Sequence, residues 1–133
     1  MSDERVDFVR DVRPILSQHC FACHGPDEHG RQAKLSLVDF ESATAPRRGH
    51  PAITPGDLDA SSVWARITDA DFPMPPAEAH NPLSAKQIDV LRRWIEQGAS
   101  YAPHWAYVTP AHVDPPPVTD DEWPHDDVDR YIL

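Results

Sequence analysis

Two cysteines and a histidine stand close together near the start of this 133-residue chain, in the stretch QHCFACHGPD. Cys20, Cys23 and His24 form the pattern C-x-x-C-H, and the chain has no other cysteine. Two thiols one helical turn apart can each add to a vinyl group of one haem, and the adjacent imidazole can then point at the iron. The pattern is typical of c-type haem attachment and predicts one covalently attached haem c, with its iron, on this segment.

Other uses of a C-x-x-C pair stay open at this point. A redox dithiol is one, although such pairs stand near a βαβ pattern and none is visible in this sequence. Half of a zinc site is another, although structural zinc usually takes four protein ligands and the chain has no second cysteine pair. The plainest alternative is two buried thiols that merely neighbour a histidine. The helical context of the motif favours haem.

A second axial ligand is predicted in the segment ADFPMPPAEAH, residues 70–80. Met74 is the only methionine apart from Met1. Methionine is most often a flexible filler of cores. Here prolines at positions 73, 75 and 76 stiffen the backbone on both sides, and a weak thioether ligand needs such stiffening to stay on the iron. Met74 is therefore the predicted distal ligand, with His80 and His50 as alternatives.

The remaining histidines and two of the tryptophans have plainer interpretations. Trp64 and Trp94 each stand at helical spacing from other apolar residues of their own predicted helix. They are predicted to be core residues rather than an electron relay. The other five histidines have no mutual spacing that indicates a metal site, so we expect them to face solvent or to make ordinary hydrogen bonds: His19, His29, His104, His112 and His125.

The clearest predicted helix runs from Ser84 to about Gln97. Ser84 and Gln87 have the spacing of a capping box, and Gly98 suits the residue after the C-cap. Ile88, Leu91, Trp94 and Ile95 then fall on one face of the helix.

Two further helices are predicted before the last one. One lies at DASSVWARITD, residues 59–69, and the other precedes the cysteines, where Pro14 makes it either kink or start late. Loops join the helices, and we expect one short strand at KLSLVDF, residues 34–40. Three short helices with long loops make a thin core, which a large apolar cofactor would organise.

Composition divides the chain into a folded body, residues 1–101, and a proline-rich acidic tail, residues 102–133. Six of the 15 prolines fall between Pro103 and Pro124, and residues 114–133 hold seven acids against one basic residue. The net charge of −10 argues against nucleic-acid binding, which needs clustered Lys and Arg. No apolar run approaches the ~20 residues of a membrane-spanning helix, and the polar start is no secretory signal.

Five segments together resemble the planctomycete-type cytochrome c domain, over roughly residues 6–101: FVRDVRPILSQHCFACHGPD, KLSLVDF, ITPGDLDASSVWARI, MPP and LSAKQIDVLRRWIEQGA. The resemblance implies an all-α, class I cytochrome c-like fold with about three to four helices and long loops around a covalently bound haem. The first and last helices would cross next to the haem, with Phe8 or Val12 packed against Leu91 and Trp94.

The same resemblance assigns roles to the site residues. Cys20 and Cys23 would form the thioethers, His24 would be the proximal ligand and Met74 the distal one. Residues 1–101 would be the cytochrome c domain. The tail looks like the opening of the uncharacterised domain that follows it in such proteins, although Asp126 stands where asparagine is expected.

Function follows from that coordination. An iron held by histidine and methionine has no open position, and Met/His ligation raises the potential, so the expected function is electron transfer and not catalysis. We expect the redox partner to be another protein or an adjacent domain of the same chain, in the periplasm or otherwise outside the cytoplasm. Two other classes stay open: a haem-based sensor with a displaceable distal ligand, and a cofactor-free or zinc-bound adaptor domain.

Overall fold

In the part of the chain that the structure describes, the regular secondary structure is helical, and loops join the helices. It is a computed structural model that describes residues 5–103, 105–119 and 122–132. In these residues no β-strand forms, and the one extended pairing is an isolated bridge between Thr54 and Asp57. The predicted all-α class is confirmed. Its α-helices are α1 (Arg13–His19), α2 (Phe21–His24), α3 (Phe40–Thr44), α4 (Ser62–Ile67) and α5 (Ala85–Glu96), and shorter turns are η1 (Phe8–Val12), η2 (Ala77–Ala79), η3 (Trp105–Tyr107) and η4 (Asp129–Tyr131).

The first helical segment changes its winding where Pro14 enters. η1 is a π-helical turn, and the N–H of Arg13 closes it by donating to the carbonyl of Phe8. Pro14 has no N–H, and its ring would press on the carbonyl four residues back, so the α-helical ladder cannot pass through this point. The α-helix therefore starts late, at Arg13, which is one of the two outcomes that the sequence predicted.

The segment 34–40 is not a strand, and that prediction is wrong. Lys34 has a positive φ of 53°, which no strand residue adopts. The N–H of Leu37 donates to the carbonyl of His24 at 2.9 Å instead of to a neighbouring strand. At the far end Asp39 caps α3 by accepting from the N–H of Ser42 at 2.8 Å. Alternating apolar residues here serve a loop that wraps the end of α2.

The last helix of the body begins and ends as its sequence predicts. The Ser84 hydroxyl accepts from the N–H of Gln87 at 3.3 Å, and the Gln87 side chain accepts from the N–H of Ser84 at 2.9 Å, which completes the capping box. At the other end Gly98 has φ +102°, a left-handed conformation that glycine adopts without a Cβ penalty.

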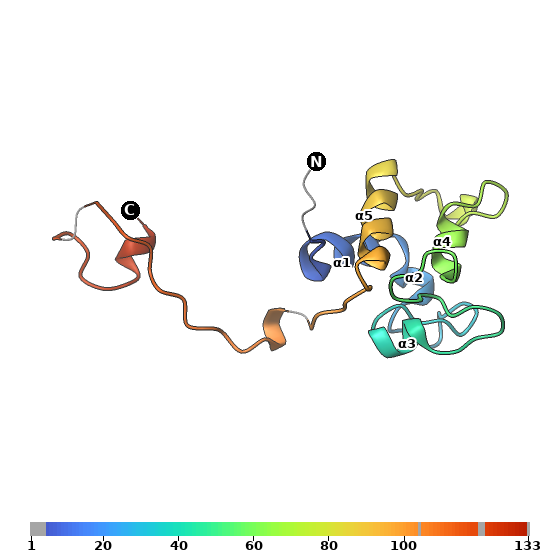
Figure 1. Ribbon diagram of the computed structural model, residues 1–133, viewed down its shortest axis with the longest axis horizontal. Coiled ribbons are helices and arrows are strands. Elements are labelled where there is room, and N and C mark those ends of the chain that lie inside the picture. The colour runs from blue at the N-terminus through green and yellow to red at the C-terminus, as the bar shows by residue number, and fades with distance from the viewer. Residues whose placement is uncertain (1–4, 104, 120–121, 133) are drawn as a thin grey trace.

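The core lies where η1 packs against α5, and buried residues of α1 belong to the same cluster (Figure 1). The rings of Phe8 and Trp94 have centroids 5.8 Å apart, so the contact between the first and last helical segments is confirmed for this pair. Tyr101 closes the cluster at 4.6 Å from Phe8, and its hydroxyl donates to the carbonyl of Leu37 at 3.0 Å. Trp94 is buried and Trp64 packs partly buried against the same core, as predicted.

The tail leaves the helical body after about residue 103 and extends away from it (Figure 1). Within the described residues, the core cluster and the apolar side chains packed on it reach no further than Tyr101. Tail side chains such as Tyr107 and Trp123 are exposed. The boundary between residues 1–101 and 102–133 stays a prediction. No helix in the described ranges is both long enough and apolar enough to cross a bilayer.

Candidate functional site

The C-x-x-C-H motif forms a tight helical turn at the end of α1. Cys20 separates α1 from α2, and the N–H of His24 donates to the carbonyl of Cys20 at 2.8 Å. Gly25 follows, and a Cβ atom there would collide with the carbonyl oxygen of Phe21. Only glycine therefore lets the chain turn away directly after the histidine.

The imidazole of His24 is held in one orientation by a loop carbonyl. Its Nδ1 lies 3.3 Å from the carbonyl oxygen of Leu35. Because a carbonyl oxygen only accepts, Nδ1 carries the proton, and Nε2 keeps the lone pair that a metal ligand needs. The N–H of Gln32 donates to the carbonyl of Cys23 at 2.7 Å, which fixes the same loop to α2. Sequence reasoning missed Leu35, since its contribution is a backbone carbonyl and no side-chain pattern marks it.

The two cysteines are free thiols in different surroundings. Cys20 is half-buried and Cys23 is exposed. Burial, with a smaller contribution from the nearby Cys23, raises the pKa of the Cys20 thiol to about 11. Redox-active C-x-x-C pairs depend on a lowered thiol pKa, so this environment disfavours a redox dithiol. In the described part of the chain, no group of three or more His, Cys, Asp or Glu side chains is assembled.

Met74 is held against the end of α4 by the backbone of its loop. Its N–H donates to the carbonyl of Arg66 at 3.0 Å. At the start of the same loop, the carboxylate of Asp69 accepts from the N–H groups of Asp71 and Phe72, at 2.8 and 2.9 Å. These bonds, together with the flanking prolines, limit the positions that the thioether can reach.

A cavity of about 350 Å³ brings the predicted site residues together. Cys20, Cys23 and His24 lie on its wall, and so does Met74, fifty residues further along the chain. Most of the exposed wall is apolar, and the volume falls within the roughly 300–1,000 Å³ of small-molecule and cofactor sites. The donor set also fits haem, because it offers two thiols for attachment and a nitrogen and a soft sulfur for the iron.

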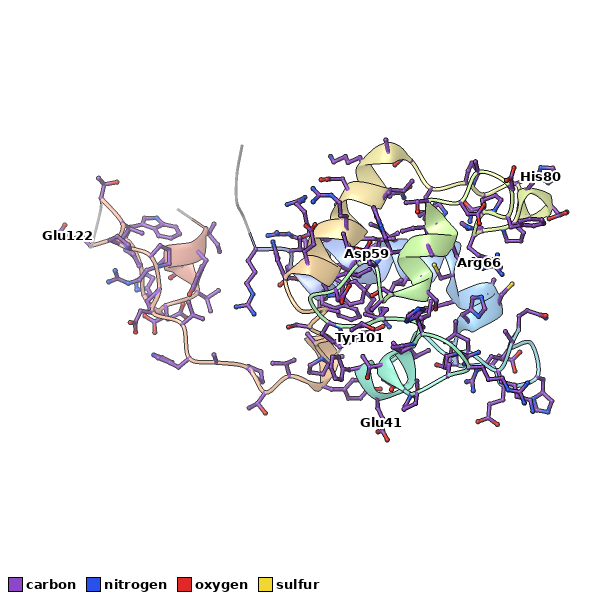
Figure 2. The ribbon with its side chains drawn as sticks, turned by 45° about the vertical axis from the view of Figure 1, so that its right-hand side comes forward. Glu41, Asp59, Arg66, His80, Tyr101 and Glu122 are labelled. Carbon is purple, nitrogen blue, oxygen red and sulfur yellow. The ribbon has the colours of Figure 1, made fainter. Side chains whose placement is uncertain are left out.

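The alternatives to Met74 are not in this cavity. His50 is exposed on the loop after α3 and lines no part of it. His80 follows η2, at the outer edge of the loop between α4 and α5 (Figure 2). It lines a second cavity of about 520 Å³, and Met74 lines both cavities.

The other described histidines make ordinary contacts or face solvent, as expected. His29, His112 and His125 are exposed, and His104 lies outside the described residues. His19 is half-buried and lines the cavity beside Cys20.

Hydrogen bonds through His19 connect three parts of the site. Gln87 Oε1 accepts from the backbone of Ser84, so its amide nitrogen points at His19 Nε2, 3.0 Å away. His19 Nε2 therefore accepts, and Nδ1–H donates to the carbonyl of Asn81 at 3.1 Å. The Asn81 side chain in turn donates to the carbonyl of Gln18 at 2.8 Å. The loop that carries Met74 is thus tied to α1 and to the start of α5.

Sequence reasoning also missed two arginines on the cavity wall, Arg47 and Arg66. Arg66 follows Val63 by three residues on α4, and Val63 lines the same cavity. Helical spacing could therefore have indicated Arg66. Arg47 lies in a loop, where no periodicity predicts the direction of a side chain.

A helical fold with a C-x-x-C-H turn on the wall of an apolar cavity is the arrangement expected of a c-type cytochrome domain. Residues 20–78 match the family described as planctomycete cytochrome C. The resemblance to the planctomycete-type cytochrome c domain is thereby confirmed over these residues. Members of the family are haem-binding electron-transfer domains, typically extracytoplasmic. Neither a curated protein nor a solved structure matches the chain.

Proposed function

We propose that this chain is an electron-transfer module with one covalently attached c-type haem. Cys20 and Cys23 form the thioethers, and His24 and Met74 are the axial ligands. The observation that supports this proposal is the single cavity whose wall carries all four side chains. When bound, haem c supplies a one-electron couple between ferric and ferrous iron.

The chain's own residues give that couple its character. His24 presents Nε2 because the Leu35 carbonyl holds the proton on Nδ1. Met74 offers a weak sulfur donor on a loop whose backbone is fixed to α4. If His24 and Met74 both held the iron, no position would be left for O₂ or a substrate, and methionine would raise the potential. Such a centre passes electrons and performs no chemistry on a bound molecule.

The electron donor or acceptor is a redox partner protein or an adjacent domain of the same chain. Because thioethers to haem are made outside the cytoplasm, the compartment is the periplasm or its equivalent. The domain would then serve as the electron carrier of a larger oxidoreductase.

Haem attachment is tested first on the purified parent chain. Visible spectra of the oxidised and reduced forms should show a low-spin c-type haem that stays with the protein after acid-acetone extraction. Replacing both thiols, Cys20→Ser with Cys23→Ser, should leave no haem after extraction. Haem that resists extraction in this double variant would contradict thioether attachment.

Met74 is tested by two substitutions in the same position. Met74→His should keep six-coordinate iron and lower the reduction potential by on the order of a tenth of a volt, because imidazole is the stronger donor. Met74→Ala should give a high-spin spectrum and carbon monoxide binding. Phe72→Ala is the matched control, since Phe72 is an exposed residue of the same loop and lines neither cavity. Unchanged spectra and potentials in both Met74 variants would show that another group holds the sixth position.

Two further tests concern the proximal ligand and the alternative function as a haem-based sensor. His24→Ala should impair haem incorporation or leave a high-spin centre, whereas His29→Ala should change nothing, because the His29 side chain is fully exposed. Carbon monoxide added to the reduced parent should not bind. Ready binding would favour the haem-based sensor over the electron carrier.

A further inference from the structure

The cavity that holds the motif has a charge opposite to that of the chain. The chain carries a net charge of −10. On the cavity wall, however, the only Lys, Arg, Asp or Glu side chains among the described residues are Arg47 and Arg66. A cationic lining in an acidic protein indicates a ligand with negative charge.

The negative groups of haem are its two propionate carboxylates. A carboxylate that enters a partly apolar cavity loses part of its hydration shell. This loss costs free energy unless a cation or hydrogen-bond donors of the protein take the place of the lost water. Guanidinium is the side chain best shaped for that purpose, because its N–H groups form a planar fork that matches a carboxylate.

We propose that Arg47 and Arg66 form the carboxylate-binding part of the haem cavity and receive the propionates. This inference rests on the proposed function. The two arginines come from different segments, Arg66 from α4 and Arg47 from the loop after α3. Figure 2 labels Arg66 at α4, and Ala22, Cys23 and His24 of α2 line the same cavity.

Each guanidinium is positioned by hydrogen bonding to backbone carbonyls, and it keeps further N–H groups that can donate. Arg66 donates to the carbonyl of Phe72 at 3.4 Å. Arg47 donates to the carbonyls of Ala33 and Lys34 at 2.7 and 3.3 Å. A guanidinium has five N–H donors, so both residues keep N–H groups for a carboxylate.

Arg47 is the better placed of the two. It is half-buried, whereas Arg66 is exposed, so water screens the charge of Arg47 less. Its two acceptors, Ala33 and Lys34, have positive φ values of 52° and 53°, and Ala33 also lines the cavity. Arg47 therefore supports a stretch of the wall as well as lining it.

The charge should be visible in the reduction potential. Oxidation adds one positive charge at the iron, and a nearby cation opposes that addition. Arg47→Gln should therefore make oxidation easier and lower the potential. We expect the ratio of oxidised to reduced protein at a fixed ambient potential to rise about threefold to tenfold, where tenfold corresponds to about 59 mV for one electron. Arg66→Gln should act in the same direction and by less.

Conservative and control variants separate charge from structure. Arg47→Lys and Arg66→Lys keep the positive charge and should keep most of the parent potential. Arg48→Gln removes the same charge from the neighbouring residue, which is exposed and does not line the cavity. All five variants and the parent are compared by spectroscopic redox titration of the holoprotein at low ionic strength.

Glutamine variants at positions 47 and 66 that lower the potential, or that lose haem while the lysine variants keep it, support the proposal. A haem-loaded parent whose potential is unchanged in the glutamine variants overturns it and leaves the proposed function intact. Loss of haem in the lysine variants as well, with Arg48→Gln unaffected, would show that these arginines act through their backbone bonds, and the proposal would again be wrong. A parent chain without haem refutes the proposed function and this inference together.

Discussion

Replacing His19 by alanine should loosen the loop that carries Met74. The substitution removes the bonds to the Asn81 carbonyl, at 3.1 Å, and to the Gln87 amide, at 3.0 Å. A neutral hydrogen bond contributes about 0.5–1.5 kcal/mol net, so the two together are worth about 1–3 kcal/mol. Both partners are half-buried, and water recovers part of the loss in the variant. We expect a destabilisation of about 1–2 kcal/mol.

The loosening should be measurable at the iron. If Met74 holds the iron as proposed, an external ligand such as imidazole can bind only when Met74 leaves, and this requires the loop between α4 and α5 to open. If His19 helps to close that loop by about 1–2 kcal/mol, imidazole should bind the ferric His19→Ala variant roughly 5–30-fold more tightly than the parent. His19→Asn, which can still donate to the Asn81 carbonyl, should give an intermediate value. His29→Ala is the control, because its side chain is fully exposed.

A double-mutant cycle decides whether the bond to Gln87 is responsible. Gln87→Ala also breaks the capping box, but this loss is common to both sides of the cycle and cancels. If the bond between His19 and Gln87 contributes, the double variant should lose less stability in denaturant unfolding than the sum of the single variants. Strict additivity, or an imidazole affinity equal to that of the parent, would refute the reasoning.

Three further predictions concern other parts of the chain. Gly25→Ala should lower the free energy of unfolding by about 1–3 kcal/mol, because its Cβ meets backbone, whereas Gly30→Ala, whose Cβ meets only a side chain, should cost less in the same denaturant titration. In the Cys23→Ser variant purified without haem, burial should still hold the pKa of the Cys20 thiol above its ordinary value, so its alkylation rate should rise up to about tenfold per pH unit between about pH 8 and about pH 9, and a plateau near neutral pH would contradict the assigned burial. A chain cut after Val113 should keep its haem spectrum, since the core cluster ends before that point, and a change of axial ligation would show that the tail belongs to the folded body.

The parts of the fold that the sequence predicted well are those with local signals. The last helix has a capping box at Ser84 and Gln87 and a glycine at position 98, and each of these acts within a few residues. Pro14 predicted the change in the first helix for the same reason, because the missing N–H has its effect within one turn.

The parts that it missed depend on distant partners. α2 and α3 have four and five residues, which is too short for an apolar repeat to be read. Leu35 and Leu37 alternate with polar neighbours like a strand. Instead, the N–H of Leu37 donates to the carbonyl of His24, the carbonyl of Leu35 accepts from the His24 side chain, and the carbonyl of Leu37 accepts from the distant Tyr101 hydroxyl. Likewise, nothing near Arg47 in the sequence indicates that it reaches the cavity.

The proline-rich segment of the tail has a consequence for solubility. An exposed apolar side chain in it, that of Val113, would ordinarily mark a site of aggregation. A cross-β ladder, however, needs an N–H from successive residues over about six positions and tolerates no proline. From Pro110 to Pro117 the longest run without proline is four residues, AHVD, and it ends in an acid. Between Pro110 and Pro117 the backbone therefore cannot pair with copies of itself, so the side chain of Val113 can stay exposed in solution.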